Sequence, residues 1–212
     1  MVQGLNFAGP AKWIKMKKPN NFQRIRELNY LQKAILAAAL LERMLPNYTL
    51  FCQATEFGES SVLRNALNSI WEKLVLPKSK INLELLVDKV EPNVPEVTDF
   101  DMFGVYPAID TATALLGMLN GLLMEDESEF VDISNISHAT VAKLIEYQLT
   151  SEDIIADNQA IREHPLMQYE MDMLSELIDH VENMGRITSE SVKALKKKAL
   201  EDGQTNIGIE IE

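Results

Sequence analysis

Cysteine is almost absent from this sequence, which contains only Cys52, and histidine occurs three times. A single cysteine cannot form an intramolecular disulfide, so the chain suits a reducing compartment, and we expect a cytoplasmic protein. Cys52 ends the mostly apolar run that starts at Tyr48. That setting favours a small packed side chain over a reactive thiol.

Long apolar runs are also missing, because no unbroken run approaches the roughly 18 residues that span a bilayer. The best candidate, Ala34–Leu41, follows several lysines, as a secretory signal would. However, Glu42 and Arg43 follow it directly, and its helical pattern begins upstream at Phe22. We therefore interpret Ala34–Leu41 as the centre of a buried helix and expect no membrane contact.

Sequence motifs of known catalytic or ligand sites are not found. The chain has no glycine-rich phosphate loop, no Gly-x-Ser-x-Gly turn, no His-Glu-x-x-His and no cysteine pair. These motifs carry the phosphate, nucleophile and metal chemistry of many enzymes, so their lack predicts no cofactor and no metal. Whether the protein is an enzyme stays open on this evidence.

Positive charge is scarce outside the N-terminal segment. The chain carries a net charge of −12, yet residues 1–33 hold seven Lys or Arg and one acid, so the remainder carries −18. A body this acidic repels phosphates, and we expect no nucleic-acid partner.

Helical periodicity is what the sequence does have. Phe22, Ile25, Leu28, Leu31 and Ile35 recur at steps of three and four residues, and similar stripes follow along the chain. The pattern predicts an all-α fold, a compact multi-helix bundle of about seven to nine helices. Pro46 is expected to end the first long helix, with a short second helix over 48–56.

Three segments are expected from composition. Residues 1–18 lack periodicity and contain four lysines, which predicts a mobile basic arm. Residues 19–203 form a single helical domain. Residues 204–212 alternate apolar and polar side chains and are expected to pack on that domain as a short extended tail.

The loop over residues 98–110 holds the strongest concentration of candidate functional side chains. It combines three carboxylates with three aromatic rings: Asp99, Asp101, Asp110, Phe100, Phe103 and Tyr106. Paired carboxylates can bind a divalent cation or act as acid and base. They can equally cap turns and helix starts while the aromatic rings hold the loop in place.

Glu42 and Arg43 are the second candidate, since they interrupt a helix segment that is otherwise apolar on every face. Buried charges must be paired. These two side chains either pair within the core or reach towards the aspartate loop, and the sequence does not choose between these arrangements.

Three segments together carry a family resemblance. They are Leu41–Tyr48 with its continuation to Gly58, Asp99–Asp110 and Thr205–Ile209. In order and spacing the chain resembles the YjaG-like family of small bacterial proteins of unknown function over residues 20–210. The resemblance implies a compact helical fold and a bacterial cytoplasmic home, and it implies no activity, cofactor or catalytic residue.

Two functions compete on the sequence. The first is a non-enzymatic helical interaction module, self-associating or binding another protein, as the missing catalytic motifs and ten methionines suggest. The alternative is an enzyme or a binder of a small ligand or divalent cation built on residues 98–110. A concave site that gathers the three aspartates with Glu42 or Tyr106 would favour the alternative.

Overall fold

The computed structural model describes residues 20–211, so the predicted basic arm over 1–18 lies outside the described residues. The described part is all-α, as the sequence predicts, and holds nine α-helices. Their bounds are α1 Asn21–Glu27, α2 Tyr30–Thr55, α3 Ser60–Val75, α4 Leu83–Val90, α5 Val105–Met124, α6 Glu127–Ser151, α7 Asn158–Glu163, α8 Pro165–Glu182 and α9 Ser189–Ala199. Two short 3-10 turns, Glu91–Asn93 and Val97–Asp99, lie between α4 and α5.

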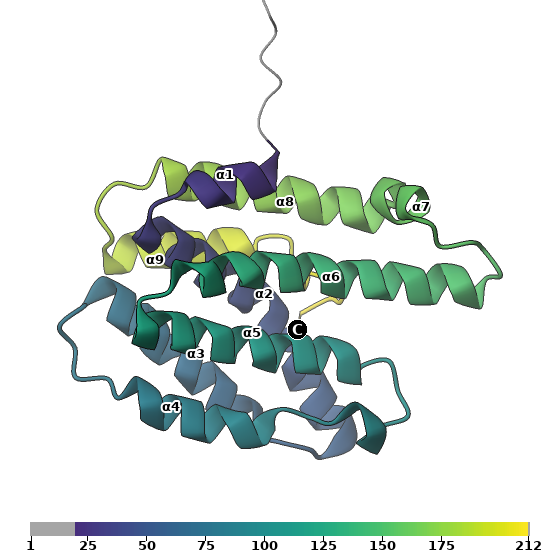
Figure 1. Cartoon of the computed structure of the whole chain (residues 1–212), viewed down its shortest axis with the longest axis horizontal. Coiled ribbons are helices and arrows are strands. Elements are labelled where there is room, and N and C mark those ends of the chain that lie inside the picture. The colour runs from purple at the N-terminus through teal and green to yellow at the C-terminus, as the bar shows by residue number, and fades with distance from the viewer. Residues whose placement is uncertain (1–19, 212) are drawn as a thin grey trace, which may run out of the picture.

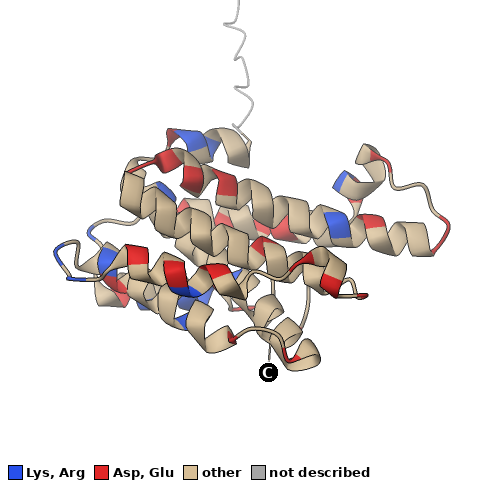
Figure 2. Cartoon of the chain, turned by 60° about the horizontal axis from the view of Figure 1, so that its bottom comes forward, with Lys and Arg blue, Asp and Glu red and all other residues tan. Residues whose placement is uncertain are grey.

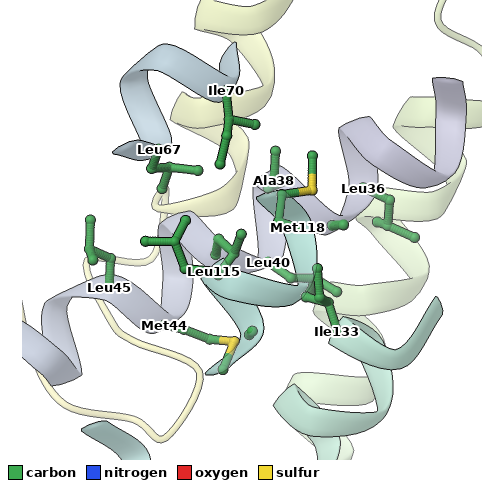
Figure 3. Close-up of a cluster of buried hydrophobic side chains, with 14 of the residues drawn as sticks. Leu36, Ala38, Leu40, Met44, Leu45, Leu67, Ile70, Leu115, Met118 and Ile133 are labelled. Carbon is green, nitrogen blue, oxygen red and sulfur yellow. The ribbon is translucent and has the colours of Figure 1, made fainter. Parts of the chain in front are cut away.

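Helix α2 is the central element, and it packs against α3, α5, α6, α8 and α9 (Figure 1). Its stretch from Ala34 to Leu45 is buried on every side. Figure 3 shows side chains of α2, α3, α5 and α6 meeting in one core, including Leu40, Leu67 and Met118. This burial follows from the sequence, where the same stretch has apolar residues at every helical face.

Pro46 does not end α2, and the separate helix expected over 48–56 is wrong. The helix continues through Pro46 to Thr55. A proline inside a helix costs about 3 kcal/mol, since it donates no hydrogen bond and crowds the preceding turn. Leu45, Tyr48 and Phe51 are buried on either side of it, so tertiary packing outweighs that local cost.

The apolar pattern that starts at Phe22 predicted one continuous helix, but the structure has two helices there, α1 and α2. Leu28 has an extended backbone, and α2 starts afresh after Asn29. The Asn29 side chain accepts from the Gln32 backbone, and the Gln32 side chain accepts from the Asn29 backbone. This capping box favours a new helix start over continuation of α1.

Helix α5 is apolar along its length, with Asp110 as its only charged residue. Among the described helices it is the one that is long and apolar enough to cross a membrane by length and composition, and half of that window is buried. In the bundle it packs against α2, α4 and α6, as a core helix does.

Residues 204–210 form a tight turn over the bundle. An isolated antiparallel bridge joins Gln204 to Glu210, and the described residues form no sheet. Thr205, Asn206 and Ile207 are buried, so this tail contributes to the interior.

Candidate functional site

Arg43 lies at the centre of a buried ionic network. Its side chain has no exposed surface, although it carries a full positive charge. The guanidinium donates to the Glu170 carboxylate of α8, to Asp202 at 3.2 Å and to the Ala199 carbonyl at 2.6 Å. One side chain therefore joins α2, α8 and the end of α9.

Burial controls the protonation of this network. Burial raises the pKa of Glu170 to about 7, against the opposing pull of the Arg43 charge. Burial also acts on Asp202, but donation from the Tyr169 hydroxyl and the Gln204 backbone, together with Arg43, lowers the pKa of that carboxyl. Asp202 is thus the ionised partner of Arg43, and Glu170 is the one that titrates near neutral pH.

Glu42 faces a different network, although it neighbours Arg43 on α2. Its carboxylate accepts from the Trp71 indole at 2.8 Å and from Arg64 at 2.7 Å, and it lies 3.1 Å from the Lys196 ammonium. Successive helix residues point about 100° apart, so the two charges diverge. Both are paired inside the bundle, and neither reaches the aspartate loop.

The C-terminal tail closes over α2 through an amide chain. The Asn206 backbone donates to the Arg43 carbonyl at 3.3 Å. The Asn206 side chain accepts from Asn47 of α2 at 2.8 Å and donates to the Ser137 hydroxyl of α6 at 3.2 Å. All these groups are buried, so the tail is held by hydrogen bonds that water does not reach.

Sequence reasoning missed Glu170, Asp202 and Asn206. One signal was available for Glu170, which falls three residues from Met167 and four from Leu174 on the apolar stripe of α8. A single acid on an apolar stripe is expected to pair with a buried cation, and Arg43 was the cation that the sequence placed in the core.

The three candidate aspartates have separate environments. Asp110 accepts from Thr140 at 2.8 Å and from Lys143 at 3.0 Å, which ties α5 to α6. Asp99 and Asp101 are exposed, and Asp99 lies 3.5 Å from the Thr98 hydroxyl. Between residues 20 and 211, no three His, Cys, Asp or Glu side chains gather closely enough to hold a metal ion.

The aromatic rings of the loop divide between the core and the surface. Phe100 turns inward and packs edge-to-face on Phe51 and Phe57, with centroid distances of 4.9 and 5.5 Å. Phe103 packs against Tyr147 of α6, with the ring centroids 4.8 Å apart and the rings tilted by 31°, and the Tyr106 centroid lies 5.7 Å from that of Phe103. The inner rings fix the loop, and the outer rings form a surface.

These outer rings line an open aromatic cleft of about 360 Å³. Lys143, Glu146 and Thr150 of α6 complete its walls. The cleft lies where α5 begins and α6 ends, on the right of Figure 1. We call this site, lined by Phe103, Tyr106, Lys143, Glu146, Tyr147 and Thr150, the aromatic cleft.

Cys52, the only thiol of the chain, is not activated. Burial raises the pKa of the Cys52 thiol more than the neighbouring Tyr48 hydroxyl and backbone amides lower it. A protonated thiol is a poor nucleophile. The Cys52 side chain therefore serves as a small apolar group packed against the core.

The sequence matches the family described as a protein of unknown function, DUF416, over residues 20–210. The chain belongs to the DUF416 family. It is 34% identical over 187 residues to the uncharacterized protein YjaG of Escherichia coli K12, which covers 88% of this chain and 94% of that one. An uncharacterized protein of Haemophilus influenzae is 35% identical over 89% of this chain and 95% of its own length.

A crystal structure of a DUF416 family protein from Shewanella baltica has the same fold. It superposes with a TM-score of 0.83 at 37% identity, covering 92% of this chain and all of that one. The descriptions of these DUF416 proteins name no activity.

The three segments that carry the family resemblance meet around α2. The Thr111 hydroxyl, directly after the aspartate loop, donates to the Met44 carbonyl at 3.2 Å. On another side of α2, the Asn206 backbone binds the Arg43 carbonyl. Helix α2 therefore contacts both the start of α5, directly after the aspartate loop, and the C-terminal tail.

Proposed function

We propose that this protein is a non-enzymatic helical binding module whose aromatic cleft holds a basic segment of a partner protein. The observation that carries the proposal is that a cluster of aromatic rings is exposed in one cleft. Tyr147 is 57% exposed and Tyr106 is 39% exposed, although both belong to helices with well-buried inner faces. Exposed aromatic clusters anchor protein interfaces, because large rigid rings bury much surface at little entropic cost.

Charge supports a basic partner. Residues 20–211 carry 16 Lys or Arg against 31 Asp or Glu, and Figure 2 shows acidic positions spread over the helices and loops. At the cleft, the ammonium of Lys143 is already paired with Asp110, so Glu146 is the unmatched charge among the lining residues. A lysine or arginine of a partner gains both this carboxylate and the faces of the tyrosine rings.

Rigidity supports binding over a purely structural role for the rings. The inner ring of Phe100 is packed on Phe51, and the Asp110–Thr140 hydrogen bond joins the two helices that form the cleft. A preformed surface loses little freedom when it binds. The cleft is also open, which suits an extended segment rather than an enclosed small molecule.

The test is an array of random nonapeptides probed with the full chain. We expect enrichment of peptides that combine lysine or arginine with an apolar side chain, with binding that weakens as salt increases. Tyr106→Ala and Tyr147→Ala should each weaken binding of an enriched peptide by about tenfold or more. The matched control is Leu50→Ala, which removes a side chain of similar exposure on a different helix, α2.

Two outcomes overturn the proposal. The first is an enriched set with no bias towards basic peptides. The second is binding that both tyrosine variants leave unchanged while their melting midpoints confirm that they fold.

A further inference from the structure

A second, larger groove lies at the opposite end of the bundle from the aromatic cleft. It has a volume of about 680 Å³ and is formed where α2 begins, α3 ends, α4 begins and α5 ends. Its lining includes the leucines Leu31, Leu74, Leu83, Leu122 and Leu123. The α3–α4 connection and the α5–α6 turn mark this end on the left of Figure 1. We call it the leucine groove.

The leucine groove leaves apolar surface in contact with water. Leu31 is 42% exposed and Leu123 is 37% exposed at its rim, while Leu74 and Leu83 are buried beneath. Single exposed leucines are ordinary, but a concave group of them marks an interaction surface.

Met124 protrudes beside this groove. It is 73% exposed and lies between Leu123 and Glu125, both of which line the groove. Helix α5 ends at Met124, and Glu125 takes a left-handed backbone with a φ of 54°. The long flexible side chain of methionine adapts well to an apolar groove. The molecule thus presents an apolar groove and an apolar projection side by side.

The groove also carries one charge of each sign. Lys73 donates to the Ser79 carbonyl at 3.3 Å and, within the described part of the chain, pairs with no carboxylate. Glu125 on the other wall likewise has no cationic partner among residues 20–211. A foreign basic or acidic peptide would satisfy one of these charges and oppose the other.

A surface with both signs is complementary to itself. In a two-fold dimer, the same patch meets on both copies, so a residue i that faces j is matched by j facing i. We propose that the leucine groove is the seat of a second copy of this chain. Met124 of each copy enters the groove of the other, and Lys73 of each copy faces Glu125 of the other. This proposal uses a different surface from the aromatic cleft and stands without it.

Charge reversal tests this arrangement, because a variant that fails to fold would not recover dimerisation when the second charge is also reversed. Lys73→Glu alone leaves four like charges facing across the interface, and so does Glu125→Lys alone. Each single variant should raise the dimer dissociation constant by about tenfold or more in sedimentation equilibrium. The double variant Lys73→Glu/Glu125→Lys should restore dimerisation, because both pairs return with their signs exchanged.

Mixing the two single variants gives a sharper result. The Lys73→Glu copy presents two acids and the Glu125→Lys copy presents two bases. The mixture should therefore form heterodimers, although neither variant alone forms a homodimer. Lys197→Glu, an exposed reversal on α9, is the matched control and should leave association unchanged. Met124→Glu should also abolish association, with far-UV circular dichroism confirming that the helices remain.

The proposal is overturned if the full chain is monomeric at every concentration up to about 1 mM. It is equally overturned if a dimer forms but Met124→Glu and both reversals leave its dissociation constant unchanged.

Discussion

The guanidinium of Arg43 on α2 and the carboxylate of Glu170 on α8 pair inside the protein, 127 residues apart in sequence. The pair shares its cation with Asp202 and with the Ala199 and Thr205 carbonyls. It therefore fastens three separate parts of the chain to the central helix.

Arg43→Met should lower the free energy of unfolding by about 3–5 kcal/mol, because it leaves the buried Glu170 and the half-buried Asp202 without a cation. Urea unfolding followed by circular dichroism measures this loss. Lys198→Met is the matched control, since Lys198 pairs with Glu176 and Glu201 at the surface and should cost less than about 1 kcal/mol. An Arg43 variant as stable as the control would show that the buried pair contributes nothing.

Glu170 should make the protein less stable as pH rises from about 4.5 to about 7. Its pKa is raised by burial to about 7 in the folded chain, whereas the unfolded side chain ionises near 4.5. Between these pH values the Glu170 carboxyl is protonated in the folded state but ionised in the unfolded state. The stability that this proton contributes is therefore fully present below pH 4.5 and declines until about pH 7. The decline should reach about 3 kcal/mol, at ~1.4 kcal/mol for each pH unit that separates the two values.

Glu170→Gln isolates this effect from the other groups that face the network. Asp202 has a lowered pKa and acts below pH 4, and the Tyr169 hydroxyl titrates at high pH. His138 opposes Glu170, because burial lowers its pKa and its contribution therefore grows as pH rises. The difference in unfolding free energy between parent and variant should vary with pH only over the Glu170 range. A constant difference from pH 4.5 to 7.5 would contradict the raised pKa.

Asn206→Ala should release the C-terminal tail. The substitution leaves the donors of Asn47 and the carbonyl and hydroxyl of Ser137 without their partner in the interior, at a cost of about 1–3 kcal/mol. Limited proteolysis should then cleave within the tail faster than in the parent. Glu210→Ala, an exposed change in the same tail, should alter stability by less than about 0.5 kcal/mol. Equal proteolysis of both variants would show that Asn206 does not hold the tail.

The three aspartates of the loop should respond differently to replacement by asparagine. Asp99→Asn and Asp101→Asn remove exposed charges and should change stability by less than about 0.5 kcal/mol. Asp110→Asn loses the ion pair with Lys143 and should cost about 1 kcal/mol. Melting midpoints with and without magnesium, calcium and manganese measure both effects. A rise in midpoint for Asp110→Asn, together with a cation response of the parent, would restore the shared carboxylate site.

The helical class of the fold was readable from the sequence because helix formation is largely local. Apolar steps of three and four residues identified Ile25, Leu28 and Ile35 as one stripe, and all three side chains are buried. Local side chains also start helices: the Asn82 and Thr188 side chains cap the first turns of α4 and α9. Pro46 was misjudged because its local cost was visible in the sequence while the packing that offsets it was not.

The loop over 98–110 shows where local reasoning stops. Its composition marked it as unusual. However, no local sequence signal distinguished Phe100, which packs inward, from Phe103, which lines the cleft. The choice depends on Phe51 and Tyr147, which come from two other helices. The functional role of the loop stays a prediction that the peptide array addresses.

The sequence by itself determined an acidic, all-α chain whose first long helix had to be buried around Ala34–Leu41 and whose Arg43 had to find a partner. Only the tertiary structure decided that the partners are Glu170, Asp202 and the tail at Thr205. The physical reason is distance along the chain. Helix signals act over a few residues, whereas a buried charge is paired by whichever segment packing brings against it. For Arg43 those segments lie more than a hundred residues away in the sequence.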